Sequence, residues 1–263
     1  MPELIETRGR RLTLYDLSQN LSNRTSDFEP NRHRIEYHTP EETARLYEAT
    51  LGLAADLWPG GIFCNAETVT ASTHSGTHID APIHYGPPDH GEPMGIDRVP
   101  LRWCIGDGVR LDFRAKPAGD GIRRADMERA LEAAEYRLKP FDIVLIWTGT
   151  DRHFGQRGYE HRHAGLRRDA TEYLVDQGVK LIGIDAWGLD RPFDVMVREA
   201  QAGDTAQLWE SHIFGRTKPY SQIEKLCNLG QLPRDHGFTV SALPIRLEAA
   251  SAAWARVVAI FWD

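Results

Sequence analysis

The run DIVLIWT, residues Asp142–Thr148, lies between Pro140 and Gly149 and is almost wholly apolar. A short apolar run with proline and glycine at its ends is typical of a strand buried on both faces of a sheet. A helical pattern over Arg167–Gln177 follows, ended by a glycine, and then a second buried run over Val179–Ile184. Together these segments predict a βαβ unit at the centre of the fold.

Strand and helix signals alternate through the rest of the chain. Leu12–Leu17 alternates as a short strand does, and the acidic, alanine-rich stretch Pro40–Gly52 predicts a helix with Thr39 as its N-cap. The further expected elements are strands at Ala66–Thr73, Gly108–Phe113, Gly237–Pro244 and Trp254–Trp262 and a helix at Arg123–Leu138. Helices and strands bury their apolar faces by stacking in layers, so the alternation predicts an α/β fold with a mixed central sheet.

Three histidines and an aspartate crowd residues 74–84, which read HSGTHIDAPIH. These four are His74, His78, Asp80 and His84. All share one parity, so in an extended chain they point to the same face, whereas a helix would set residues 78 and 80 roughly 200° apart. Imidazole and carboxylate together suit zinc, manganese or ferrous iron. The segment therefore predicts a metal site on an extended chain that bends at Gly76 and Pro82.

Composition sets the broad class of the protein. The 263 residues contain no linker, repeat or low-complexity tract, which favours a single domain over residues 1–263. A formal net charge of −7 gives no basic footprint, so nucleic-acid binding is not expected. No apolar run approaches the roughly 20 residues of a membrane span, and the N-terminus is charged, so we expect a cytoplasmic protein without membrane contact. Cys64, Cys104 and Cys227 are too few and too scattered for a disulfide framework.

Candidates for further ligands come much later in the chain. His212 and Glu224 supply an imidazole and a carboxylate twelve residues apart, although Glu224 followed by Lys225 is more often part of a solvated helix face. Asp185, at the end of the second buried run, could support a ligand or cap the loop that follows. The residues alone leave these alternatives open.

HSGTHIDAPIH resembles the H-x-G-T-H-x-D-x-P-x-H motif of the cyclase family and matches it at every fixed position. The family contains bacterial kynurenine formamidases, isatin hydrolases and proteins of aromatic polyketide ring closure. Leu14–Ser18, Leu181–Asp185 and Leu243–Arg246 are similar to the family as well, so the resemblance covers nearly the whole chain. It implies a swivelling β/β/α-type fold with a mixed central sheet.

The resemblance also implies a metal-dependent hydrolase that opens a cyclic or aromatic amide, lactam or ester. The ligands that the resemblance implies for one or two divalent ions, zinc or manganese, are His74, His78, Asp80, His212 and Glu224. His84 is left for proton transfer, and a bound cation would lower the pKa of water from about 15.7 toward about 7. We expect a small-molecule pocket lined by Trp58, Phe63, Trp187 and Tyr220, although each of these residues could instead belong to the hydrophobic core. Relatives imply a homodimer or homotetramer.

Three segments depart from the formamidase pattern and leave the substrate open: extra residues around Glu41–Gly61 and Arg152–Gly165, and the loop Ala186–Asp190. Two other functions remain alternatives to hydrolysis. One is an aromatic polyketide ring cyclase, in which His84 is the base for aldol closure. The other is a catalytically silent binding protein of the same fold, against which the intact ligand set argues.

Overall fold

The computed structural model describes residues 2–7, 9–29 and 32–262. The chain divides into two compact units, of which unit 2 is Ser22–Ser72 and unit 1 is Met1–Leu21 together with Thr73–Asp263. Each unit contains its own β-sheet. The expected single domain over residues 1–263 stays a prediction.

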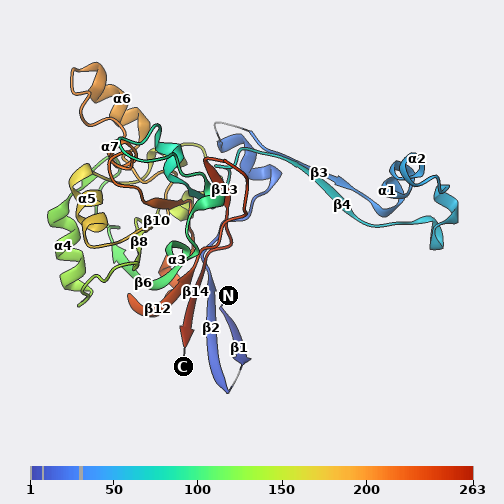
Figure 1. The fold of residues 1–263 in the computed structure, drawn as a ribbon, viewed down its shortest axis with the longest axis horizontal. Coiled ribbons are helices and arrows are strands. Elements are labelled where there is room, and N and C mark those ends of the chain that lie inside the picture. Colours follow the sequence, from blue (N-terminus) through green and yellow to red (C-terminus); the bar gives the residue numbers. More distant parts are fainter. Residues whose placement is uncertain (1, 8, 30–31, 263) are drawn as a thin grey trace. The chain divides into compact units, whose positions relative to one another are not determined.

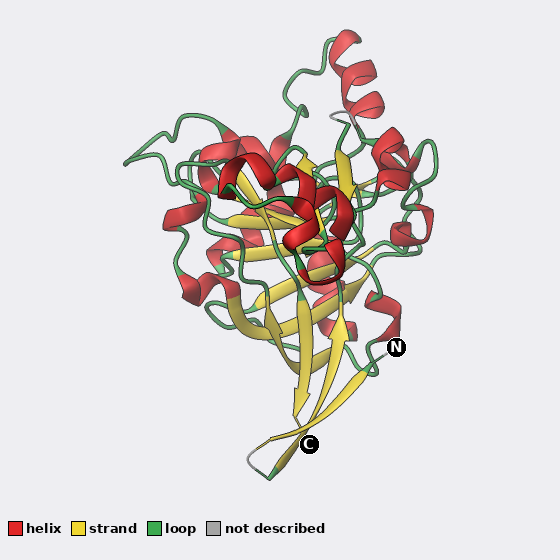
Figure 2. Ribbon diagram, turned by 90° about the vertical axis from the view of Figure 1, so that its right-hand side faces the viewer, coloured by secondary structure: helices red, strands yellow, loops and turns green. Residues whose placement is uncertain are grey.

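Unit 1 is built on a ten-stranded mixed sheet with the strand order β1-β2-β14-β12-β6-β8-β10-β11-β5-β13. The strands are β1 (Glu3–Thr7), β2 (Arg10–Asp16), β5 (His78–Asp80), β6 (Ile105–Asp112), β8 (Ile143–Trp147), β10 (Leu181–Ile184), β11 (Ser221–Glu224), β12 (His236–Ser241), β13 (Ala252–Trp254) and β14 (Val258–Trp262). The ribbon of β1, β2 and β14 extends away from the helices (Figure 2). The predicted α/β class with a mixed central sheet is confirmed.

Four parallel strands, β6, β8, β10 and β11, form the centre of this sheet. The predicted βαβ unit is confirmed, because α5 (Arg168–Asp176) connects β8 to β10 and these two strands pair in parallel. Val144 and Ile146 belong to the core cluster on the side of α5, while Ile143 and Leu145 belong to the opposite cluster. Both faces of β8 are therefore buried, which explains its uninterrupted apolar sequence.

The helices of unit 1 are short. They are α3 (Leu101–Cys104), α4 (Arg124–Ala133), α5, α6 (Phe193–Gln201) and α7 (Glu210–Phe214), with 3₁₀ turns η4 (Pro82–Tyr85), η5 (Ile96–Arg98), η6 (Thr150–His153), η7 (Tyr159–His161) and η8 (Leu229–Gln231). The small strands β7 (Gly121–Ile122) and β9 (Gly165–Leu166) pair with each other. Figure 1 shows α4 and α5 along one side of β8 and β10. Among the described residues, none of the helices combines the length and apolarity that a bilayer crossing requires.

The motif segment enters the sheet as β5, between β11 and β13. The expected bends are confirmed: Gly76 has a φ of 63°, and Pro82 begins the turn η4. In the antiparallel register of β5 and β11, His78 lies opposite Glu224 and Asp80 opposite Gln222. The fold thereby places two parts of the chain that are far apart in sequence side by side.

The C-terminal run Trp254–Trp262 is two strands, which corrects the prediction of one. β13 ends at Trp254 and pairs with β5 at one end of the sheet, whereas β14 begins at Val258 and pairs with β2 and β12 near the other end. No single straight strand can reach both partners. The helix predicted at Pro40–Gly52 is two short helices, which end at Leu46 and Leu51, and the helix predicted at Arg123–Leu138 already ends at Ala133. The remaining predicted elements are found with shifted bounds.

Unit 2 contains an antiparallel pair of strands, β3 (Arg34–His38) and β4 (Ala66–Thr70). The short helices α1 (Pro40–Leu46) and α2 (Glu48–Leu51) and the turns η2 (Ala55–Leu57) and η3 (Pro59–Gly61) connect them, and η1 (Asn23–Phe28) precedes them. Thr39 caps α1 as predicted, because its side chain accepts a hydrogen bond from the Glu42 backbone N–H.

Candidate metal centre

The first half of the centre is a group of three side chains, two of them buried. His74 Nδ1 lies 2.9 Å and His78 Nε2 lies 3.2 Å from the same oxygen, Oδ1 of Asp80. Glu224 Oε2 approaches His78 Nε2 to 3.6 Å from the neighbouring strand β11. His78 and Asp80 are both fully buried. Three nitrogen and oxygen donors therefore converge within 4.8 Å of one another, as ligands of one cation would.

The chemistry of these atoms fits a cation. The Nδ1 atom of His78 donates to the backbone oxygen of Gly76 at 2.8 Å, which leaves Nε2 with a lone pair. Burial lowers the pKa of His78, which favours the neutral ring that binds a cation. His78 Nε2 and Asp80 Oδ1 are buried and lie 3.2 Å apart without a hydrogen bond between them. Two lone pairs in this position are unfavourable until a cation lies between them.

The two carboxyl groups carry opposite pKa shifts. Burial alone would raise the pKa of Asp80, but His78 and His74 hold it well below its ordinary value. Burial and the neighbouring Asp80 carboxylate raise the pKa of Glu224 well above its ordinary value. The two carboxyl groups lie so close together that ionising both is unfavourable. A divalent cation between them would relieve the repulsion between the two negative charges.

The motif segment is fixed to β11 by two further bonds. Thr77 Oγ1 donates to the Lys225 backbone oxygen at 2.6 Å, and Lys225 Nζ donates to the His74 backbone oxygen at 2.8 Å. Behind the ring of His74, Nε2 contacts Ser251 Oγ at 3.1 Å. These bonds hold His74 beside Asp80 although its side chain is only partly buried.

The second half of the centre lies on the other side of Asp80. His84 Nε2 and His212 Nε2 are each 3.9 Å from Asp80 Oδ2, and His212 Nε2 is also 3.9 Å from Glu224 Oε1. The fold thus brings together all six residues that were predicted as ligands or as the proton-transfer group. Burial lowers the pKa of His84 to about 4, so its imidazole is neutral at neutral pH.

Gln222 occupies the middle of this second half and was missed by the sequence analysis. Its Nε2 atom is 2.7 Å from His212 Nε2, 3.0 Å from Asp80 Oδ2 and 3.1 Å from Glu224 Oε1. Its Oε1 atom lies 3.1 Å from the hydroxyl of Tyr220. The available signal was parity, since residues two apart on a strand share a face and Gln222 precedes Glu224 by two.

The predicted aromatic residues lie in different places. Trp187 is half-buried and packs edge-on against Phe193 at 5.7 Å, in a loop whose Leu189 N–H donates to Glu224 Oε1. Tyr220 is fully buried and stacks on Tyr85 at 5.2 Å. Trp58 and Phe63 belong to unit 2, where their ring centroids are 4.4 Å apart. A substrate contact at any of these residues stays a prediction.

Asp185 fixes the turn that follows β8. Its Oδ1 accepts from the backbone N–H and the hydroxyl of Thr148, at 2.7 and 2.6 Å, and its Oδ2 accepts from the Gly149 N–H at 2.7 Å. Burial raises its pKa to about 7. Of the two roles left open by the sequence, the loop-capping one agrees with these contacts.

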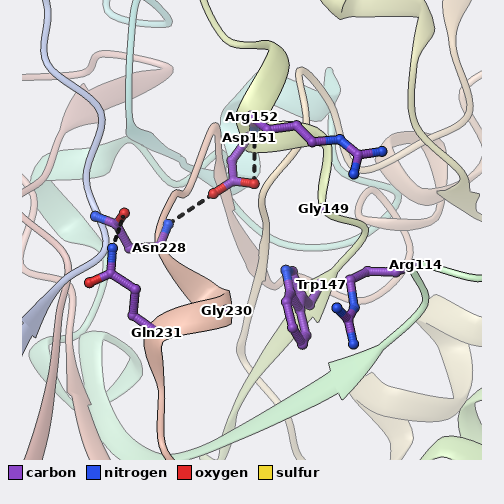
Figure 3. Close-up of a pocket in the computed structure, with 8 residues that line it drawn as sticks. All are labelled: Arg114, Trp147, Gly149, Asp151, Arg152, Asn228, Gly230 and Gln231. Atoms are coloured by element: carbon purple, nitrogen blue, oxygen red, sulfur yellow. Dashed lines mark hydrogen bonds between the residues drawn. The ribbon is translucent and has the colours of Figure 1, made fainter.

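A separate pocket of about 270 Å³ lies at the carboxyl ends of β6 and β8. Its lining consists of Arg114, Trp147, Gly149, Asp151, Arg152, Asn228, Gly230 and Gln231. Figure 3 shows the Arg114 guanidinium against the Trp147 ring, 3.6 Å from its centroid, and Asp151 accepting from the Asn228 N–H. Arg114 pairs with Asp112 at 2.7 Å, and the Arg152 backbone N–H donates to Asp151 Oδ1 at 3.0 Å.

Residues 15–191 match the model of a protein family described as "Putative cyclase". This match covers more than half of the chain, which therefore belongs to the cyclase family.

Two curated relatives and one solved structure show the extent of the likeness. The chain is 28% identical over 233 residues to a kynurenine formamidase of Maricaulis maris (strain MCS10), covering 82% of this chain and 97% of that protein. It is 27% identical over 161 residues to cyclase-like protein 1 of Arabidopsis thaliana, covering 59% of this chain and only 58% of that protein. The fold is similar to the crystal structure of an isatin hydrolase bound to the product analogue thioisatinate, with a TM-score of 0.73 and 22% sequence identity. The likeness covers 96% of this chain and 93% of that chain. The last likeness confirms the predicted cyclase-like fold.

His163, outside the centre, gives a prediction about acid stability. It is 1% exposed, its Nε2 donates to the Asp190 backbone oxygen at 2.9 Å, and burial lowers its pKa from 6.5 to about 4. A pKa lowered by folding means that this stability is complete above pH 6.5 and is lost as the pH falls toward 4. We expect urea unfolding at pH 7.5 and pH 4.5 to show wild type losing about 2 kcal/mol relative to His163→Gln. An equal acid response of the two proteins would contradict this.

Proposed function

We propose that this protein is a metal-dependent hydrolase that opens the C–N bond of an aromatic or cyclic amide or lactam, or the corresponding ester. The observation that carries the proposal is the His74, His78 and Asp80 group, in which three nitrogen and oxygen donors lie within 4.8 Å of one another and two of the three residues are fully buried. The kynurenine formamidase relative and the isatin hydrolase fold neighbour support the class of bond.

His74, His78 and Asp80 hold the ion, with Glu224 Oε2 as the next oxygen within reach. Zinc and manganese both suit this set of nitrogen and oxygen ligands. When bound, such a cation polarises a carbonyl and lowers the pKa of water into the neutral range. Asp80 remains ionised in the protein itself, so this carboxylate is ready to bind a cation at neutral pH.

His84 is the proton carrier. Its ring is neutral, its side chain is 22% exposed, and Nε2 lies toward Asp80. In hydrolysis the oxygen of water adds to the carbonyl carbon and the bond to the leaving nitrogen breaks. Nε2 of His84 accepts the proton that water loses and returns it to the leaving nitrogen, so no external acid is needed.

The number of ions depends on Gln222. Its amide nitrogen takes the space between Asp80, His212 and Glu224 that a second cation would need. We therefore expect one ion per chain in wild type and up to two in Gln222→Ala when zinc is in excess, measured by elemental analysis after gel filtration. Gln231→Ala, in the pocket of Figure 3, is the matched control. Two ions in wild type, or no gain in the variant, would show that the amide does not exclude a cation.

The experiment that tests the proposed function is a substrate screen on stripped and reloaded protein. After removal of metal by a chelator, the protein is incubated with zinc or manganese and assayed on formyl-kynurenine, isatin, lactones and simple anilides. We expect ring opening or deacylation of at least one of these only after metal is restored. Equal activity of the stripped protein would reject metal dependence, and inactivity on the whole panel would reject the bond class.

A homodimer or homotetramer, the absence of nucleic-acid and membrane partners, and a cytoplasmic location stay predictions. Unit 2 favours assembly with a second copy, because a 51-residue unit that exposes many large apolar side chains is typical of an interaction surface. These side chains are Tyr37, Leu46, Tyr47, Leu51, Leu57, Ile62, Phe63 and Val69.

A further inference from the structure

The chain between Asp190 and Trp209 leaves the neighbourhood of His212 and returns to it. This segment contains α6 and is cross-linked within itself. Arg191, 7% exposed, donates to both carboxylate oxygens of Glu199, at 3.0 and 2.6 Å, and to Gln207 Oε1 at 2.6 Å. Gln207 in turn donates to the Met196 backbone oxygen at 2.7 Å. The two ends of the segment are therefore held at fixed positions.

Asp190, at the first end of the segment, binds the ring nitrogen of His212 that points away from the metal centre. Asp190 Oδ1 accepts from the Ser211 N–H at 2.7 Å. Asp190 Oδ2 accepts from the His212 N–H at 3.2 Å and from His212 Nδ1 at 2.5 Å. Both carboxylate oxygens accept from backbone N–H groups, so Nδ1 is the donor to Oδ2 and carries the ring proton. The lone pair of Nε2 then faces Gln222, Asp80 and Glu224.

Trp209, at the second end of the segment, packs against the face of the same ring and fixes its orientation. Trp209 stacks on His212 with a centroid separation of 4.1 Å and an interplanar angle of 16°. Its backbone is left-handed, with φ 50° and ψ 44°, a conformation that is costly for a bulky residue. Strain of this kind persists only where the surroundings impose it, and here it delivers the indole onto the imidazole.

We propose that Asp190 and Trp209 are positioning residues that together fix the tautomer and the ring plane of His212. The carboxylate sets which nitrogen carries the proton, and the indole sets where the free nitrogen points. We call the contacts of Asp190 and Trp209 with His212 the clamp. Its importance for turnover rests on the proposed function. The clamp itself is a property of the chain and can be measured without metal or substrate.

Asp190→Ala separates the tautomer from the rest of the site, because it removes the acceptor that faces Nδ1 of His212. Asparagine would not do so, since its amide oxygen can take the place of Oδ2 and still accept from Nδ1–H. Without an acceptor at Nδ1 the ring proton is no longer held there, and the Nε2–H form becomes populated. A His212 in this form has no free lone pair at the centre.

The measurement is a long-range ¹H–¹⁵N spectrum of the histidine side chains in metal-free protein, with His212→Gln to assign the signal. We expect the Nδ1–H form in wild type and a populated Nε2–H form in Asp190→Ala. In the reloaded enzyme, kcat of the variant should fall by roughly 10- to 100-fold, the usual effect of losing such a partner. Asp194→Ala is the matched control, because this exposed carboxylate of α6 contacts His161 instead.

Three variants of Trp209 separate the ring from the backbone strain. Trp209→Phe keeps a stacking ring and should stay near wild type. Trp209→Ala loses the ring, and Trp209→Gly loses the ring and the strain, since glycine tolerates a positive φ. If the ring positions His212, Ala and Gly should lower kcat by a similar factor of about 10. Recovery in Gly alone would mean that the residue matters only for the backbone, and would overturn its part of the proposal.

The outcomes separate this inference from the proposed function. An Nε2–H signal for His212 in wild type, or an unchanged tautomer in Asp190→Ala, overturns the clamp whatever the enzyme does. The expected tautomers in a protein that hydrolyses nothing on the panel would leave the clamp standing and remove the proposed function.

Discussion

Replacing His78 or Asp80 with alanine is expected to leave a folded protein without bound metal and without hydrolase activity. Both side chains are fully buried, and each supplies one of the two donor atoms that lie 3.2 Å apart at the centre. Elemental analysis should find close to one ion per wild-type chain and almost none in either variant. His163→Gln, another buried histidine substitution, should keep its metal. Retention of metal by His78→Ala and Asp80→Ala would show that the ion binds elsewhere.

Replacing His84 with alanine is expected to reduce kcat by roughly 10²- to 10⁴-fold while metal content stays close to that of wild type. The reason is that His84 reaches Asp80 only at 3.9 Å and keeps part of its ring exposed, as a proton carrier does. His84→Gln, which can form a hydrogen bond but cannot shuttle a proton, should be equally slow.

A parallel loss of metal would give His84 a different role. His84, Asp80 and His212 offer three atoms within 4.8 Å of one another, so His84 would then be a ligand in that second group. Comparing metal content with kcat in the same preparations distinguishes the two roles.

The centre of the fold could be predicted because its signals are local. The run at Asp142–Thr148 is apolar at every position inside β8, since both faces of that strand are buried. The break between β13 and β14 could not be predicted, because it depends on two partners at different ends of the sheet. Only Ala255, Arg256 and Val257 separate the two strands, and none of them is a proline or glycine, so the sequence carries no turn signal for the break.

The site follows the same division between local and non-local causes. The parity of residues 74–84 indicated a shared face, and the resemblance added His212 and Glu224, which the fold brings beside Asp80. The roles of Asp190 and Trp209 were not predicted from the sequence, because they arise only when the segment around α6 folds back onto His212. A tautomer and a stacking contact leave no periodic pattern in a sequence.

The central claim is that water, activated at a metal centre, is added to a carbonyl carbon. The most direct measurement is turnover in ¹⁸O-water, with carbonyl exchange controlled, comparing metal-loaded and stripped protein by mass spectrometry. The account predicts one ¹⁸O atom in the new carboxylate of each product molecule, and product only from the loaded protein. Product that forms without label, as in an aldol ring closure, or labelled product from metal-free protein at the same rate, would contradict it.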